Sequence, residues 1–346
     1  MEDDETQERV VGMAESMDAT VDLVLEGGGV KGIALVGAIS VLEEHGYSFN
    51  RVAGTSAGAI VGALVAAGIS AEDMTEVMRT TDYRRFQDET WIDKAGPLGK
   101  GLSILFQQGI YEGDYLREYL TDLLPERART FAGLRIPKDR GNPMPDDERF
   151  RLVVMASDIS RHELVRLPWD CEAFYGTDPE EMSVVDAVRA SMSIPLFYEP
   201  HKIEHILEQE GRARRITSTL VDGGMLSNFP VDIFDRKRNR EPRWPTFGIK
   251  LSGGPADRPE PTQIKGPLSY SFGILSTLLG WHDRAHINDP DICARTIFVD
   301  TFGISPVAFD LDDGQRDRLY ESGRTAAEKF LKSWSFDRYK HDFPRT

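Results

Sequence analysis

One pentapeptide constrains the fold of this 346-residue chain more than any other feature, namely Gly54-Thr55-Ser56-Ala57-Gly58. The apolar residues before it predict a short strand, and the small and branched apolar residues 59–67 predict a helix directly after it. A serine on such a strand-to-helix turn points its hydroxyl out of the fold, and the flanking glycines avoid collisions with neighbouring backbone. We therefore predict a nucleophile elbow at Ser56, with a chance match in an ordinary tight turn as the alternative.

A glycine-rich loop follows the strand predicted for residues 21–25. Residues 26–32 read EGGGVKG, and the apolar spacing after them predicts a helix. Gly27, Gly29 and Gly32 fit the G-x-G-x-x-G pattern of a dinucleotide-binding loop. The acidic residue that such a unit needs after its second strand is missing, however, because the serine turn stands there.

The same loop also suits the chemistry of ester hydrolysis. Backbone N–H groups at a helix N-terminus bind anions, including the oxyanion that forms when a nucleophile attacks an ester. This use accounts for the glycine loop and the serine turn together, whereas a dinucleotide site accounts for the loop alone. A purely structural role of the glycines in a tight turn is the third interpretation.

An aspartate is the next candidate for a catalytic group. Residues 218–221 predict a strand, and Asp222 follows it directly, with Gly223 and Gly224 behind it. A carboxylate at the carboxyl end of a strand is well placed for catalysis in an α/β sheet, and the glycines let other backbone approach closely. An Asp-Gly turn without any chemistry is the structural alternative.

Ser56 needs a base, because an unassisted hydroxyl is a poor nucleophile near neutral pH. A triad would combine Asp222 with a histidine, whereas a dyad would let Asp222 accept the serine proton directly. The dyad requires burial in an apolar cleft to raise the pKa of the Asp222 carboxyl above its usual value near 4. The histidines considered for the triad are His201, His205, His282 and His286. None of these histidines lies in a sequence context typical of a catalytic base. The residues by themselves therefore leave both the triad and the dyad open.

The composition excludes several classes of function. A formal charge of −16 and a pI near 5.0 argue against a nucleic-acid partner, which would need a basic surface. Cys171 and Cys293 lie too far apart for a CxxC metal pair and indicate no disulfide framework. The first 20 residues lack the basic and apolar regions of a secretory signal, and no stretch of about 18 uncharged apolar residues predicts a membrane-spanning helix. We therefore expect a cytoplasmic protein that meets a membrane only peripherally.

The length suits one large α/β domain. We predict a flexible acidic tail at residues 1–20, the catalytic domain at residues 21–332 and a second tail at residues 333–346. Residues 91–109 mix glycine, aromatic and apolar residues without a clean period, which predicts irregular packing or a lid over the site. The apolar residues 268–281 favour a buried helix over an interfacial one.

Four motifs, in their order along the chain, resemble those of the patatin-like phospholipases: GGGVKG, GTSAG, SMSIPLFYEP and DGG. The similarity spans about residues 21–332, and the combination is far more specific than any single motif. It implies an α/β protein with a three-layer α/β/α fold and a mainly parallel central sheet. By position it implies a dyad of Ser56 as nucleophile and Asp222 as proton acceptor, with no catalytic metal and no cofactor. The oxyanion hole would consist of Gly27, Gly28 and Gly29, supported by the motif residues Lys31, Gly32, Gly54, Thr55, Ala57, Gly58, Gly223 and Gly224.

Two positions depart from the pattern of this family. Lys31 stands where arginine is frequent, so the positive charge is kept. Ile194 stands before the proline of the third motif, where alanine is frequent, and its larger side chain is expected to narrow the acyl channel.

The resemblance implies a serine acyl hydrolase that releases fatty acids from membrane glycerophospholipids or other lipid esters. Three alternatives stay open. One is a ligand-activated effector that degrades membranes by the same chemistry, another is a non-catalytic lipid-binding member, and the last is a Rossmann-type dinucleotide-binding protein. The sequence sets neither the lipid head group nor the oligomeric state.

Overall fold

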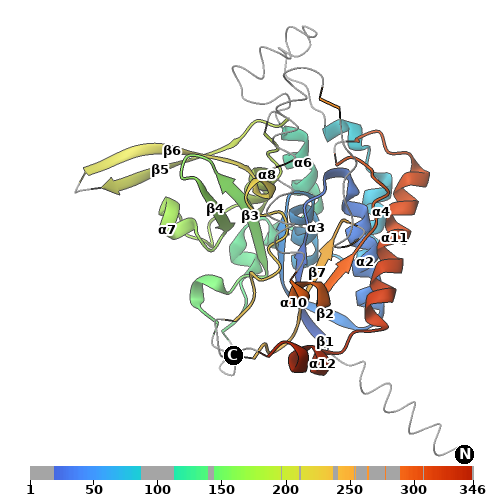
Figure 1. The fold of residues 1–346 in the computed structure, drawn as a ribbon. Coiled ribbons are helices and arrows are strands. Elements are labelled where there is room, and N and C mark those ends of the chain that lie inside the picture. Colours follow the sequence, from blue (N-terminus) through green and yellow to red (C-terminus); the bar gives the residue numbers. More distant parts are fainter. Residues whose placement is uncertain are drawn as a thin grey trace, which may run out of the picture.

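The computed structural model describes residues 19–86, 113–138, 144–195, 197–209, 212–236, 241–252, 254, 263–264, 277, 289–306 and 308–344. Within these residues a single eight-stranded sheet lies at the centre of the molecule, and helices flank it (Figure 1). The strands are β1 (Ala19–Leu25), β2 (Tyr47–Thr55), β3 (Leu152–Asp158), β4 (Glu163–Leu167), β5 (His201–Gln209), β6 (Arg212–Asp222), β7 (Thr246–Lys250) and β8 (Thr296–Phe298). The helices are α2 (Gly32–Glu44), α3 (Ala57–Ala66), α4 (Ala71–Thr80), α6 (Asp114–Leu123), α7 (Cys171–Tyr175), α8 (Val184–Ser191), α10 (Pro290–Ala294), α11 (Asp313–Leu331) and α12 (Phe336–Asp342).

The sheet is mainly parallel, as predicted. Its strands follow the order β5-β6-β3-β2-β1-β7-β8, and β4 pairs with β3 outside this path. The strands from β3 through β2, β1 and β7 to β8 are parallel, whereas β4, β5 and β6 pair antiparallel. The predicted α/β class and its three-layer arrangement are thereby confirmed.

The two faces of the sheet are covered by different connections. Figure 1 shows α2, α4 and α11 stacked along one side of the sheet. The chain moves from β1 to β2 in one direction across the sheet, and β7 and β8 extend it in the other direction. Crossovers between parallel strands are right-handed, so connections that run in opposite directions across the sheet lie on opposite faces of it. The connection from β1 to β2, which contains α2, therefore covers one face, and the connection from β7 to β8, which contains α10, covers the other.

Helix α2 is the most deeply buried helix beside the site. Eleven of its thirteen residues are buried, because it lies between the sheet and α11. The two helices approach closely at Gly37 and Gly323, where an added Cβ would collide with the Tyr320 and Ala34 carbonyl groups respectively. This packing fixes the helix that begins at the glycine loop, and hence the loop itself.

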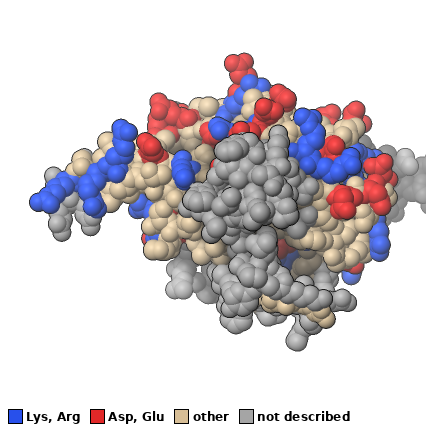
Figure 2. Space-filling view, turned by 90° about the horizontal axis from the view of Figure 1, so that it is seen from above, with Lys and Arg blue, Asp and Glu red and all other residues tan. Residues whose placement is uncertain are grey.

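A long hairpin of β5 and β6 projects from one side of the molecule (Figure 1). The sequence predicted a strand only for residues 218–221, but β6 already begins at Arg212 because its residues pair with β5. Figure 2 shows basic side chains along this arm, of which Arg212, Arg214 and Arg215 are exposed. The hairpin ends at Asp222, so it connects an exposed arm directly to the candidate site.

Both ends of the described chain are more regular than the sequence indicated. Ala19 and Thr20 already belong to β1, while residues 1–18 lie outside the described part. Residues 333–346 were expected to form a tail, but they contain α12, and the Tyr339 side chain is buried near Trp334. The limits of the catalytic domain itself stay a prediction. Among the described helices, none combines the length and hydropathy needed to span a bilayer.

Candidate active site

Ser56 lies on a sharp turn between β2 and α3. Its backbone has a φ of +53° and a ψ of −124°, a strained conformation for a residue other than glycine. β2 ends at Thr55 and α3 begins at Ala57, which is the predicted succession of strand, turn and helix. An added Cβ at Gly54 would collide with the Gly58 carbonyl, and one at Gly58 would collide with the backbone at the end of β1. Only glycine fits these two positions.

The Ser56 side chain meets the carboxyl group of Asp222, the last residue of β6. Both residues are buried, with exposed fractions of 4% and 5%. Burial raises the pKa of Asp222 from 3.8 to about 6, while hydrogen bonds donated by the Gly224 N–H and the Ser56 side chain oppose the rise. The Ser56 hydroxyl also reaches Met192 Sδ, a weaker acceptor, at 3.4 Å. The structure thus brings together the two residues that the sequence analysis selected.

The turn that ends α8, residues 191–193, holds the backbone of both residues. The Ser56 N–H donates to Ser191 Oγ at 2.8 Å, and the Asp222 N–H donates to the Ser193 carbonyl at 2.9 Å. Ser191 and Ser193 are fully buried, and Met192 lies between them in the chain. The sequence analysis quoted this segment as part of a motif but assigned no role to Ser191 or Ser193. Two serines, one at each side of Met192 at the end of the predicted helix, were the available signal.

Arg189 anchors this turn from within α8. Its guanidinium donates to Ser193 Oγ at 2.7 Å and to the Glu199 carbonyl at 2.9 Å. The side chain is buried, and an added Cβ at Gly113, which has a φ of +78°, would collide with it. The position of Ser193 therefore depends on a buried, hydrogen-bonded cation that sequence reasoning did not identify.

The glycine loop lies against the serine turn. An added Cβ at Gly27 would collide with the Asn228 side-chain oxygen and would lie 3.0 Å from Ser56 Cβ, so glycine lets the loop pack closely against the serine turn. The Gly27 N–H already donates to the Asn228 carbonyl at 3.3 Å. No hydrogen bond joins the N–H groups of Gly28 and Gly29 to any described residue. Gly29 has a φ of +57°, so its left-handed conformation also favours glycine.

An ion pair fixes the start of this loop to β7. Glu26 and Lys250 are both buried and form a salt bridge. The Leu251 N–H also donates to the Glu26 carboxylate, and the Asn228 amide bridges the Glu26 carboxylate and the Gly27 carbonyl. Lys31 lies nearby, and its pKa is lowered by burial, with Glu26 opposing and Lys250 adding to the shift. Sequence reasoning treated Glu26 only as the residue before the glycines.

The supporting motif residues join neighbouring segments. The Thr55 hydroxyl donates to the Ser227 carbonyl at 3.3 Å. An added Cβ at Gly223 would collide with the Met155 carbonyl of β3. Gly32 lies at the start of α2, where an added Cβ would touch the side chains of Ala57 and Met78 at ordinary contact distance. These positions set the spacing of β1, β2, β3 and β6 around the site.

An apolar cavity of about 40 Å³ adjoins the serine turn. Ala57 and Met192, the neighbours of the Ser56 side chain, line it together with Gly29 of the glycine loop. Ile194, which the sequence analysis expected to narrow an acyl channel, also lines it. The aromatic side chains of its wall are Tyr83, Phe86, Tyr119, Tyr198 and Phe309.

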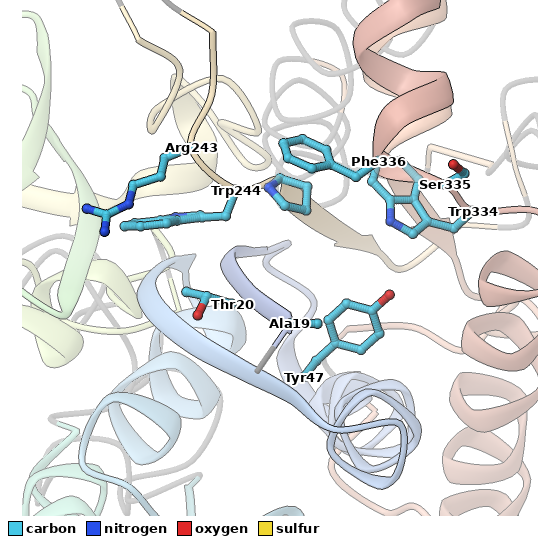
Figure 3. Close-up of a pocket in the computed structure, with 9 residues that line it drawn as sticks. Ala19, Thr20, Tyr47, Arg243, Trp244, Trp334, Ser335 and Phe336 are labelled. Atoms are coloured by element: carbon cyan, nitrogen blue, oxygen red, sulfur yellow. The ribbon is translucent and has the colours of Figure 1, made fainter. Parts of the chain in front are cut away.

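A larger cavity of about 520 Å³ lies at the opposite end of the parallel strands (Figure 3). It is lined by the first residues of β1 and β2, by the segment before β7 and by residues 334–336. Ligands of α/β sheets bind at the carboxyl ends of the strands, which here carry Ser56 and the glycine loop. We therefore assign the candidate active site to the small cavity beside Ser56, although the cavity at the opposite end of the strands is larger.

The histidines considered for a triad do not complete one among the described residues. His205 Nε2 and Ser218 Oγ form a hydrogen bond of 3.1 Å, and the His205 ring packs on Tyr175, so this residue serves the hairpin. His201 begins β5, and burial lowers its pKa. His282 and His286 lie outside the described residues, as do residues 91–109 and nearly all of residues 268–281.

The chain matches one family model and several known proteins. The family model described as patatin-like phospholipase matches residues 23–235, which include the glycine loop, Ser56 and Asp222. The uncharacterized protein YqhO of Bacillus subtilis is 34% identical over 316 residues, which cover 91% of this chain and 99% of YqhO. Lysophospholipase nte1 of Aspergillus niger is 53% identical over 47 residues, 14% of this chain and 3% of the fungal protein. The crystal structure of VipD from Legionella pneumophila aligns with a TM-score of 0.49 at 16% identity, covering 91% of this chain and 67% of VipD.

Proposed function

Because the chain belongs to the patatin-like phospholipase family, we propose that it is a serine acyl hydrolase that releases fatty acids from membrane glycerophospholipids. Family membership supports lipid ester hydrolysis in general. The observation that carries the specific proposal is the contact of Ser56 with the buried carboxyl of Asp222, beside a glycine loop and an apolar cavity. The dinucleotide alternative loses support, because the family match includes the serine turn as well as the loop.

In the first step Ser56 Oγ attacks the ester carbonyl while Asp222 accepts its proton. A carboxylate with an ordinary pKa is a weak base, but the Asp222 pKa of about 6 brings it closer to the working pH. The tetrahedral oxyanion would accept hydrogen bonds from the Gly28 and Gly29 N–H groups, each worth about 3 kcal/mol in the transition state. Gly27 would contribute by letting the loop approach Ser56, since its N–H is engaged with Asn228.

The acyl-enzyme then forms when the bond from the carbonyl carbon to the alcohol oxygen breaks. The proton held by Asp222 passes to the leaving alkoxide, which departs as a lysolipid or another alcohol. A water molecule next attacks the acyl carbon, and Asp222 accepts a proton from that water. Collapse of the second tetrahedral species returns this proton to Ser56 Oγ and releases the fatty acid, so no cofactor is consumed. The acyl chain would lie in the apolar cavity, while the protein meets its lipid substrate at the membrane surface.

The direct test is to incubate the protein with a natural lipid extract and to analyse the products by mass spectrometry. We expect free fatty acids and lysolipids with the wild-type protein, and neither with Ser56→Ala. Release of fatty acids at similar rates by both proteins would contradict Ser56 as the nucleophile. Release only after an added ligand would favour the effector alternative, whereas lipid binding without products would favour a non-catalytic member.

A second prediction concerns the turn of residues 191–193, which holds the backbone of Ser56 and Asp222. Ser191→Ala removes the acceptor of the Ser56 N–H, so the nucleophile loses its fixed orientation. We expect kcat for ester hydrolysis to fall about a hundredfold, with little change in KM, as typical for misplacement of a reacting group. Steady-state kinetics on a soluble ester measures this.

Ser193→Ala is the matched control for Ser191→Ala. Ser193 holds Asp222 through its backbone carbonyl, so the substitution keeps that bond and removes only the contact with Arg189. We expect lower thermal stability but a much smaller loss of kcat. Equal losses of kcat in both variants would contradict a positioning role for Ser191.

A further inference from the structure

One hydroxyl among the described residues that line the apolar cavity has no hydrogen-bond partner. Tyr83 lines the cavity, its side chain is 9% exposed, and its hydroxyl oxygen is buried and unpartnered within the described chain. The two other phenols of the described wall are engaged. The Tyr119 hydroxyl pairs with Thr81 Oγ1 at 3.0 Å, and the Tyr198 hydroxyl donates to the Phe86 carbonyl at 2.9 Å.

The unpaired hydroxyl of Tyr83 destabilises the folded protein. A buried hydroxyl that lacks a partner costs about 1–3 kcal/mol, and buried polar groups in folded proteins are almost always paired. Burial raises the pKa of Tyr83, so the hydroxyl stays protonated and can donate. Phenylalanine would supply the same ring packing against Phe86 and the Arg316 guanidinium without this cost.

The remaining surroundings of Tyr83 point to an oxygen atom as the missing partner. The Nε of Arg316, whose guanidinium lies 5.2 Å from the centroid of the Tyr83 ring, is also buried without a partner. The rest of the cavity wall is mainly hydrocarbon and aromatic, and a plain acyl chain would leave the Tyr83 hydroxyl unpaired. A chain that carries a hydroxyl or keto oxygen would satisfy it.

The cavity also limits where that oxygen can be. Ala57, which follows the nucleophile in the chain, lines the cavity together with Met78 and Tyr83. A volume of about 40 Å³ is only a few times that needed for one water molecule, so it holds a short piece of chain. An oxygen that pairs with Tyr83 therefore lies within a few carbons of the ester carbonyl.

We propose that the cavity beside Ser56 selects acyl chains that carry a hydroxyl or keto group near the ester carbonyl, and that Tyr83 is the residue that recognises this oxygen. The proposal rests on the proposed function and specifies its substrate class. Tyr83 acts as a specificity residue and takes no part in bond cleavage.

The experiment compares wild type with Tyr83→Phe on aryl esters of octanoic acid that bear a keto group at each chain carbon in turn, and on the unsubstituted ester. We expect the wild type to prefer at least one keto ester by about tenfold in kcat/KM, the value of one net hydrogen bond. Tyr83→Phe should abolish that preference, which is read as the ratio of kcat/KM for the keto and the unsubstituted ester within each variant. Tyr119→Phe is the matched control, because its hydroxyl is already paired with Thr81, and it should keep the preference.

Binding provides a readout without turnover. In the Ser56→Ala background, the preferred keto acid should displace a fluorescent fatty acid more strongly than octanoic acid does, and adding Tyr83→Phe should remove the difference. A wild type that prefers the unsubstituted ester throughout, or a preference that survives in Tyr83→Phe, would overturn the proposal. Those outcomes leave the proposed function standing, since it fails only if no ester is cleaved in a Ser56-dependent manner.

Discussion

Ser56→Ala is expected to lower kcat/KM for ester hydrolysis by about four to six orders of magnitude, the loss typical of removing a serine nucleophile. The substitution deletes only Oγ, so the N–H bond to Ser191 and the strained turn are retained. The fold should therefore be unchanged, and the thermal midpoint should stay close to that of wild type. Rates are measured with a soluble aryl ester, on which no membrane contact is needed.

A fluorophosphonate probe gives this prediction a chemical control. The probe should label wild type at Ser56, as read by peptide mass spectrometry, and should leave Ser56→Ala unlabelled. Hydrolysis at near wild-type rate by a folded, unlabelled variant would rule out Ser56 as the nucleophile. Labelling of another serine in the wild type would identify the true site.

The second large effect concerns Asp222 and pH. Because Asp222 must be ionised to accept the serine proton and its pKa is about 6, kcat/KM should rise with pH through about 6 and then level off. Asp222→Asn keeps the volume and can still accept from the Gly224 N–H, but it cannot act as a base. We expect a loss of about four orders of magnitude and no inflection near pH 6.

The same substitution should stabilise the protein at neutral pH. The Asp222 pKa is higher in the folded than in the unfolded chain, so the folded state binds the extra proton between about pH 4 and 6, and stability falls as pH rises through that window. The folded protein thus keeps an ionised carboxylate at neutral pH at a cost of about 3 kcal/mol. Asp222→Asn removes this cost. Denaturant unfolding at about pH 7.5 and about pH 4, on the two sides of the window, should show a higher free energy of unfolding for the variant only at the higher pH.

Two results would contradict the role of Asp222. One is a pH profile of wild type that stays flat well below pH 6, since no base of that pKa would then be needed. The other is a collapse of activity in folded His282→Ala or His286→Ala, which would favour the triad. Both histidines lie outside the described residues, so kinetics is the way to test them.

The sequence predicted those features of the site that depend on adjacent residues. The positive φ of Ser56 and the close contact between Gly54 and Gly58 follow from a motif of five residues. The Ser183 side chain accepts a hydrogen bond from the Asp186 N–H at the start of α8, as is typical of a serine that precedes a helix. Such features depend on backbone conformation and short-range hydrogen bonds, which a few adjacent residues determine.

Contacts between residues far apart in the chain could not be predicted from the sequence. Ser191 and Ser56 are 135 residues apart, and nothing in the helix that ends at Ser191 indicates which N–H its hydroxyl will accept. The pairing of Glu26 with Lys250 spans 224 residues. The length of the hairpin was also missed, because the polar residues of β6 pair along an exposed arm and show no buried face.

The sequence by itself determined a glycine loop, a serine turn and a strand-end aspartate, because steric limits at glycine and the geometry of tight turns operate between neighbouring residues. Only the tertiary structure decided that Asp222 meets Ser56 in a buried place, that one turn holds both, and that the Tyr83 hydroxyl remains unpaired. Desolvation and hydrogen-bond satisfaction depend on what surrounds a group in space, and those surroundings come from segments far away in the chain.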